Sequence, residues 1–387
     1  MAEIGVGMVG YKFMGRTHSN AYRQVAHFFD VDPTPRMRVL CGRDAAGVEQ
    51  AARSLGWEEW ETDYRKMVAR DDIGLVDVAS TGNTHYTVVM EALKHGKHIL
   101  CEKPLANTLS EAGEMGVAAR NAGVVNMVNF NYRRVPAVQL AKQLVESGKL
   151  GEIRHWRAAY QQDWILDPSF PLVWRLQKDL AGSGALGDIG AHIVDLSHFL
   201  IGSIDSVVGT LDTFITERPL EISDASNVGL EAKASAEMGK VTVDDSVTFL
   251  AKFSNGVTGT FEATRLAPGR RNKNAFEIYG SKGSLTFDME KMNELLVYFV
   301  DDPVGLQGFR SISVTEPSHP YAAWWPTGHI FGYEHNFVHV VNDLLDGIHD
   351  GVSPHPTFED GYRCQAVLDA VERSAASGHW ESPAPLP

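Results

Sequence analysis

Short apolar runs alternate with amphipathic stretches in the first third of the chain. Runs of strand length occur at 4–9, 37–41, 75–79, 98–101 and 124–128. Between them, apolar residues at helical spacing predict helices, such as Ala45–Leu55 behind the capping residue Asp44. Strands separated by helices of this length predict a doubly wound parallel sheet of Rossmann type. We assign this α/β domain to residues 1–128.

The pattern changes to alternation with a period of two in residues 129–387. Strands are expected at 153–160, 206–214, 246–253, 257–263, 275–279, 284–287 and 295–300, with turn signals at Asn255-Gly256 and at 280–283. Helices are expected at 137–148, 337–347 and 358–377, and the last is a candidate to pack back on the first domain. The polar, aperiodic segment Ser223–Lys240 predicts a loop or short helix. The second domain is therefore predicted to be α+β, with a large, mostly antiparallel open sheet.

Composition narrows the class of protein. The chain has 387 residues and a net charge of −14, which argues against nucleic acid or an anionic membrane as a partner. Three widely spaced cysteines favour neither a disulfide framework nor a thiolate metal site. No apolar run is long enough to span a bilayer. We expect a reduced, cytoplasmic, two-domain protein.

A glycine-rich turn follows the first predicted strand. Gly10-Tyr11-Lys12-Phe13-Met14-Gly15 stands between a strand and a helix, which is the setting of a dinucleotide fingerprint. Lys12 occupies the place of the second glycine, and its ammonium could lie near a pyrophosphate; a purely structural turn is the alternative. After the second strand, Gly42 and Arg43 favour NADP, but Arg43 could equally stack on adenine, so the choice of cofactor stays open here.

A second candidate group lies at 187–195. In a helix, Asp188, His192 and Asp195 would share one face. The group could be a structural polar cluster, an acid–base site or, with His198, a metal site.

Four segments together carry a resemblance. They are the glycine turn, Cys101-Glu102-Lys103-Pro104-Leu105, Phe130-Asn131-Tyr132-Arg133-Arg134-Val135-Pro136, and Asp188-x-Gly190-x-His192-x-x-Asp195. In this order they resemble the Gfo/Idh/MocA family of NAD(P)-dependent sugar and polyol oxidoreductases, over essentially the whole chain. The glycine turn is similar to that of a subgroup with levoglucosan and inositol dehydrogenases.

The resemblance implies that Lys103, Asp188 and His192 are catalytic. Oxidation of a secondary alcohol requires a base for the hydroxyl proton, and neutral His192 suits that role. The Lys103 ammonium would stabilise the developing alkoxide, and Asp188 would orient His192 or bind a neighbouring hydroxyl. A metal site is then not expected.

The resemblance and the strand ends also give most of the expected binding residues, and the aromatic and polar character of their segments gives Gln162, Trp164 and His335. The cofactor is expected to be NAD, with NADP as the alternative, held by Gly10, Lys12, Phe13, Met14, Gly42, Arg43, Ser80, Thr81, Asn83, His85, Glu102 and Lys103. Substrate is expected to contact Lys103, Tyr132, Arg133, Gln162, Trp164, Asp188, His192 and His335. In this family the open sheet is covered by a second subunit, so a homo-oligomer, either dimer or tetramer, is expected.

Three functions compete at this point. The first is a dehydrogenase that oxidises a sugar, anhydrosugar or cyclic polyol. The second is a glycoside hydrolase or eliminase in which bound NAD is reduced and reoxidised within one turnover. The third is a non-catalytic dinucleotide sensor, which the retention of Lys103, Asp188 and His192 argues against.

Overall fold

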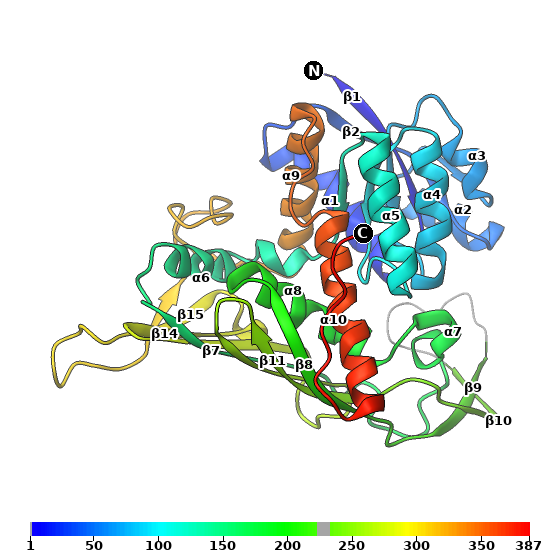
Figure 1. Cartoon of the computed structure of the whole chain (residues 1–387). Coiled ribbons are helices and arrows are strands. Elements are labelled where there is room, and N and C mark those ends of the chain that lie inside the picture. The colour runs from blue at the N-terminus through cyan, green and yellow to red at the C-terminus, as the bar shows by residue number, and fades with distance from the viewer. Residues whose placement is uncertain (1, 223–232) are drawn as a thin grey trace.

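The computed structural model describes residues 2–222 and 233–387 and contains two main sheets (Figure 1). The first has six parallel strands in the order β3-β2-β1-β4-β5-β6. Their bounds are β1 Glu3–Val9, β2 Thr34–Cys41, β3 Glu59–Glu61, β4 Leu75–Val78, β5 His98–Cys101 and β6 Asn126–Val128. The predicted doubly wound parallel sheet is confirmed, with the change of strand order between β1 and β4.

Helices cover both faces of this sheet because its strands are apolar on both sides. One face packs against α1 (Phe13–Phe28), α2 (Ala45–Leu55) and α9 (His335–Asp350). The other packs against α3 (Tyr64–Val68), α4 (His85–Lys94) and α5 (Leu109–Ala122). Thus α9 comes from the last part of the chain but completes the core beside β1.

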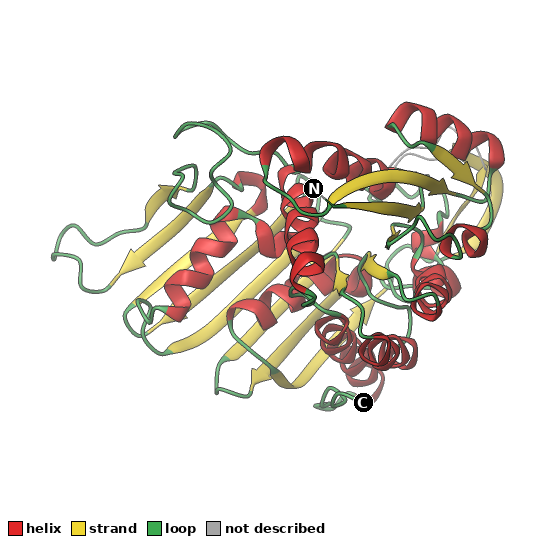
Figure 2. Ribbon diagram, turned by 90° about the horizontal axis from the view of Figure 1, so that it is seen from above, coloured by secondary structure: helices red, strands yellow, loops and turns green. Residues whose placement is uncertain are grey.

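The second sheet has eight strands in the order β16-β15-β14-β13-β7-β12-β11-β8. All neighbours are antiparallel except β7 and β12, which confirms the predicted, mostly antiparallel sheet. Helices α6 (Pro136–Glu146) and α8 (Ala191–Leu200) lie across one face (Figure 2). On the other face exposed residues alternate along the strands, including Leu250. The strands are β7 Ile153–Gln161, β8 Ile204–Asp212, β11 Ser246–Phe253, β12 Thr258–Thr264, β13 Lys273–Gly280, β14 Gly283–Asp288, β15 Glu294–Phe299 and β16 Arg310–Ser313.

A small antiparallel sheet pairs β9 (Glu217–Ile222) with β10 (Lys233–Lys240). The expectation of a loop or short helix over Ser223–Lys240 is therefore wrong for its described part, and residues 223–232 lie outside the described residues. Strand pairing with β9 overrode the weak periodicity of β10. Beside these strands, Ile165, Leu172, Val173, Leu176, Val241 and Val243 form a small separate core.

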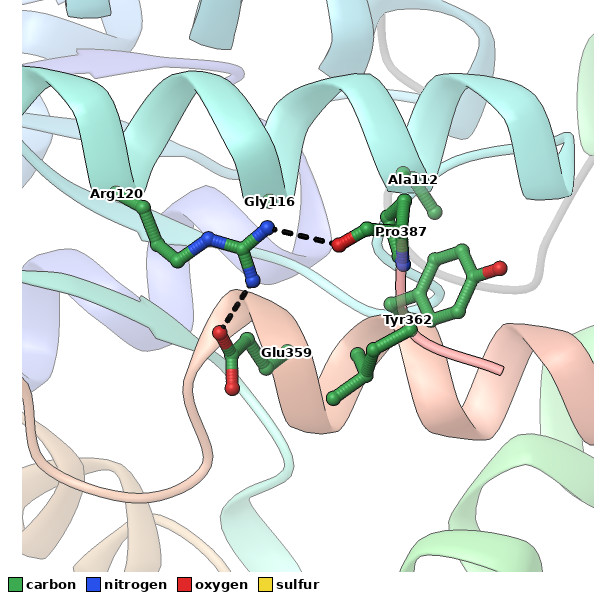
Figure 3. A pocket seen from close by; sticks show the side chains of 8 residues that line it. Ala112, Gly116, Arg120, Glu359, Tyr362 and Pro387 are labelled. Carbon is green, nitrogen blue, oxygen red and sulfur yellow. Dashed lines mark hydrogen bonds and ion pairs between the residues drawn. The ribbon is translucent and has the colours of Figure 1, made fainter. Parts of the chain in front are cut away.

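The last helix, α10 (Phe358–Ser377), packs against both α5 and β8. Figure 3 shows a pocket on the α5 side of this contact. There the Arg120 guanidinium donates to Glu359, at 2.6 Å, and to the carbonyl of Pro387, at 3.1 Å. This pocket contains none of the predicted site residues. No helix in the described part of the chain is long and apolar enough to cross a membrane.

Candidate active site

Lys103 lies in the turn that follows β5, at the carboxyl edge of the first sheet. Its ammonium donates to the backbone carbonyl of Asp188 at 2.5 Å and lies 3.5 Å from the Asp188 carboxylate. Asp188 belongs to the segment before α8, on the second sheet. The two motifs, far apart in the sequence, therefore meet between the two sheets.

Asp188 lies in a π-helical turn, Leu186–Gly190, rather than in the ordinary α-helix that we predicted. The buried Asp244 carboxylate accepts hydrogen bonds from the backbone N–H groups of Gly184 and Leu186, at 2.7 and 2.8 Å. A Cβ on Gly184 would lie 1.8 Å from the Asp244 carbonyl oxygen, so only glycine fits at this position. Asp244 thus holds the start of the segment, which forms one wide π-helical turn. The regular helix α8 begins after it, at Ala191.

Three cations surround the Asp188 carboxylate. Besides Lys103, the Arg265 Nη1 lies 3.5 Å and the Arg175 Nε 4.0 Å from its Oδ2. Burial raises the pKa of Asp188, but Lys103, Arg175 and Arg265 together lower it to about 2. Asp188 is therefore ionised at neutral pH. We did not predict Arg175 or Arg265 as site residues, because neither belongs to a local motif.

His192 follows on α8 and is almost fully buried. Its ring packs against Tyr132, Tyr160 and Phe130, at centroid distances of 4.5, 5.8 and 6.2 Å. No residue in the described part of the chain forms a hydrogen bond with the imidazole. Burial and the Lys103 cation lower the pKa of His192 well below 6.5. The imidazole is therefore neutral at pH 7 and can accept a proton.

A row of polar groups extends from His192 along the second sheet. Tyr132 and Tyr160 share a hydrogen bond of 2.9 Å, and the Tyr160 hydroxyl donates to Asn272 at 2.8 Å. Gln162 also donates to Asn272, and the Trp164 indole donates to Gln162. The predicted substrate residues Tyr132, Gln162 and Trp164 are thus brought together with His192. Tyr160 and Asn272 complete the row and were missed.

The glycine turn fits a dinucleotide. Gly10 has φ +106°, and a Cβ there would lie 2.5 Å from the Ala79 carbonyl oxygen; a Cβ on Gly15 would lie 2.2 Å from that of Gly10. No side chain caps the N-terminus of α1, where Lys12 precedes the helix, so its N–H groups can face an anion.

The remaining predicted cofactor residues lie at or beneath the same edge. The Tyr11 ring lies against Gly42, and Asp44 caps α2 by accepting from the Gly47 N–H. Ser80, Thr81 and Asn83 lie in the loop after β4, with Phe13 and Met14 at the start of α1 and Arg43 after β2.

Comparison with known proteins decides the family. Residues 4–130 match the model described as "Oxidoreductase family, NAD-binding Rossmann fold", and residues 138–286 match the "GFO/IDH/MocA C-terminal domain". The chain belongs to the Gfo/Idh/MocA family. It is similar to levoglucosan dehydrogenase from Pseudarthrobacter phenanthrenivorans, at 41% identity over 98% of each chain.

Solved structures agree with this assignment. An oxidoreductase domain protein from Kribbella flavida is 52% identical, with a TM-score of 0.94 over 100% of each chain. Levoglucosan dehydrogenase in complex with NADH and levoglucosan is 39% identical, with a TM-score of 0.93 over 99% of this chain and 100% of that one. The protein is an NAD-dependent oxidoreductase, which confirms the expected cofactor and class of enzyme.

Four predicted site residues of this Gfo/Idh/MocA protein have other environments. Arg133 is buried and donates to the Asp195 carboxylate at 2.6–3.1 Å, so its guanidinium supports α8. Its contact with substrate stays a prediction. The His335 ring accepts from the Gly332 N–H and packs against Trp324 and Phe331. From the same segment Tyr333 reaches the site, 6.5 Å from Tyr132 between centroids, and we missed it.

His85 and Glu102 lie below the cofactor edge. The buried His85 imidazole lies between the carbonyl oxygens of Pro104 and Ser80, at 3.0 and 3.1 Å, and so ties the loops after β4 and β5. Glu102 is buried among side chains of the first domain. Both side chains hold this edge of the sheet in place, and their contact with the cofactor stays a prediction.

Proposed function

We propose that this enzyme oxidises a secondary hydroxyl of a cyclic sugar, anhydrosugar or polyol to a ketone, with Lys103, Asp188 and His192 as its catalytic residues. The observation that carries the proposal is the contact of the Lys103 ammonium with Asp188 immediately before the His192 helix. Relatives support the substrate class: one is a levoglucosan dehydrogenase and another a scyllo-inositol 2-dehydrogenase (NAD⁺) from Bacillus subtilis, 26% identical over 73% of this chain.

The residues divide the reaction between them. Neutral His192 accepts the hydroxyl proton, and the Lys103 ammonium stabilises the alkoxide that forms as the proton leaves. Bound NAD supplies the acceptor for the hydride from the same carbon. The ionised Asp188 holds Lys103 in place and can accept a hydrogen bond from a neighbouring hydroxyl. Arg175, half-buried beside Asp188, is placed to donate to a further substrate oxygen.

The decisive test is a panel of levoglucosan, alkyl glycosides and inositols with NAD and with NADP, followed by the absorbance of the reduced cofactor. We expect net NADH formation with at least one of these compounds. A hydrolase that reoxidises its cofactor within one turnover would instead release product with no net NADH.

Substitutions test the residues. We expect Lys103→Ala and His192→Ala each to lower kcat by about 10²–10⁴-fold, while the Kd for NADH, measured by fluorescence titration, stays within a few-fold. His329→Gln is the matched control, because this imidazole lies in an exposed loop and, among the described residues, is hydrogen-bonded to the Pro326 carbonyl alone. Near-normal turnover by His192→Ala would show that the catalytic assignment is wrong.

We also propose that the enzyme is a homo-oligomer paired through the exposed face of the second sheet. Leu250 stands on this face, and an open sheet with exposed apolar residues favours pairing with a second copy. Sedimentation velocity should give the mass of a dimer or tetramer, and a monomer at micromolar concentration would contradict the proposal.

A further inference from the structure

His18, on α1, is a buried imidazole between two carboxylates. Its Nδ1 lies 2.9 Å from Asp77 on β4, and its Nε2 lies 2.9 Å from Glu102 at the end of β5. All three side chains are almost completely inaccessible to solvent. The imidazole therefore connects two neighbouring strands of the cofactor sheet directly beneath its carboxyl edge.

Glu102 in turn holds the turn that carries Lys103. One carboxylate oxygen of Glu102 accepts from His18 and from the Asn129 amide, and the other accepts from the backbone N–H of Lys103 at 3.1 Å. On the opposite side, the Tyr22 hydroxyl donates to Asp77 at 2.9 Å. A continuous set of hydrogen bonds thus leads from α1 to the backbone of Lys103.

The charges of this group are interdependent. Burial lowers the pKa of His18, but the Asp77 and Glu102 carboxylates outweigh burial and raise it to about 10. Burial alone would raise the pKa of Glu102, but His18 lowers it below its usual value. At neutral pH the bridge is an imidazolium between two carboxylates, and removal of the cation would favour protonation of Glu102.

We propose that His18 is a positioning residue for the dehydrogenase reaction, which acts through Glu102 to hold the Lys103 turn in contact with Asp188. The inference rests on the proposed function, since it assumes that Lys103 is catalytic. His18 itself is buried beneath the sheet edge, so in this proposal Lys103 and His192 contact the substrate and His18 does not. Small displacements of a catalytic group are enough to lower turnover strongly.

The test compares kcat, KM and their pH dependence in His18→Gln with those of the wild type. Glutamine removes the cation but keeps a polar group. We expect kcat to fall by about 10–100-fold, with the Kd for NADH nearly unchanged. We also expect a new decline of kcat on the acid side, because Glu102 without His18 becomes protonated at higher pH and loses its bond to Lys103.

The double variant His18→Gln/Glu102→Gln identifies the titrating group. It has no carboxyl at position 102, so the new acid decline should disappear while kcat stays low. Other titratable groups that face Glu102 remain in both variants: Lys103, His85, Cys101, Arg175, Tyr132 and Tyr333. Tyr22→Phe is the comparison variant, because it removes one hydrogen bond to Asp77 but leaves both ion pairs of His18. We expect a smaller fall in kcat than in His18→Gln and no new acid decline.

The outcomes separate the two proposals. If Lys103→Ala is inactive but His18→Gln has wild-type kcat and pH dependence, the positioning role is overturned and the proposed function stands. A lower kcat without the new acid decline also overturns it, since general destabilisation would explain that result. If Lys103→Ala remains active, the proposed function itself fails. Should His18→Gln not fold, Glu102→Gln alone decides, and wild-type kcat in that variant overturns the inference.

Discussion

Each half of the proposed active site lies above a buried cation between two carboxylates, but the two cations are placed differently. Beneath Lys103, the two nitrogens of His18 face Asp77 and Glu102 at equal distances of 2.9 Å. The imidazole ring has one nitrogen toward β4 and the other toward the end of β5, so it pairs with one carboxylate at each strand at the same distance.

Beneath His192, the Arg133 guanidinium is placed less evenly. It lies 2.6 Å from Asp195 on α8 but 3.9 Å from Asp360 on α10. Burial raises the pKa of Asp195 to about 6 in spite of Arg133, and the neighbouring Asp360 adds to the rise. In the first domain, by contrast, the pKa of Glu102 is lowered.

The two groups are therefore expected to differ in their response to pH. In the His18 group, each carboxylate has its own nitrogen, so the charged state is favoured. In the Arg133 group, one guanidinium serves two unequal carboxylates, and one of them gains a proton near pH 6. We therefore expect the charge of the Arg133 group, beneath His192, to change in mild acid, whereas the charge of the His18 group, beneath Lys103, stays the same.

Removal of the Arg133 cation is expected to have the largest effect. Arg133→Met leaves the buried Asp195 without its nearest cation, while Asp360 keeps His355 at 2.6 Å and Arg363 at 4.0 Å. We expect the free energy of unfolding to fall by about 3–5 kcal/mol in urea denaturation. The control is Arg363→Met: this exposed side chain lies 4.0 Å from Asp360, and we expect a change within about 0.5 kcal/mol. Equal effects of the two substitutions would contradict a buried supporting role for Arg133.

A smaller effect is expected on how the free energy of unfolding depends on pH. Because the pKa of Asp195 is higher in the folded chain than in the unfolded one, the folded state binds more protons between about pH 4 and 6. Stability from this group therefore falls as pH rises through that range, by roughly 3 kcal/mol in total.

Asp195→Asn removes this dependence. The unfolding free energy of the wild type relative to Asp195→Asn should decrease between about pH 4 and pH 6 and level off above. Glu102, with its lowered pKa, contributes in the opposite sense: its stabilisation is present above the unfolded pKa and is lost as pH falls through the folded one. If the difference in unfolding free energy between the wild type and Asp195→Asn did not depend on pH, the expected pH response of the Arg133 group would be wrong.

The sequence predicts those elements whose signals are local. β5, α2 and β11 have the predicted bounds, because apolar periodicity and caps such as Asp44 are properties of neighbouring residues. The short edge strand β3 and helix α3 were missed, since three or five residues carry too little periodicity. The π-helical turn before α8 was also missed, because it depends on Asp244, far along the chain.

Most of the candidate site was predicted through motifs, and Gln162 and Trp164 were predicted from the chemistry of their side chains. Lys103, Asp188 and His192 were found through the family resemblance, and the structure brings them together. His18, Arg175, Arg265 and Tyr333 carry no such signal. His18 is 59 residues from Asp77 and 84 from Glu102, and only the closed sheet reveals that it bridges them. Arg133 belongs to a motif, but in the structure it pairs with Asp195, and its contact with substrate stays a prediction.

The position of α9 bears on how the protein is made. Phe337, Val341 and Leu344 fill the core beside β1, although they are synthesised long after that strand. When only the first domain has emerged from the ribosome, the apolar surface that α9 will cover is therefore exposed to water and to chaperones. It stays exposed until translation is nearly finished. The strand β1 is synthesised first, but its core is completed only when α9, near the end of the chain, packs against it.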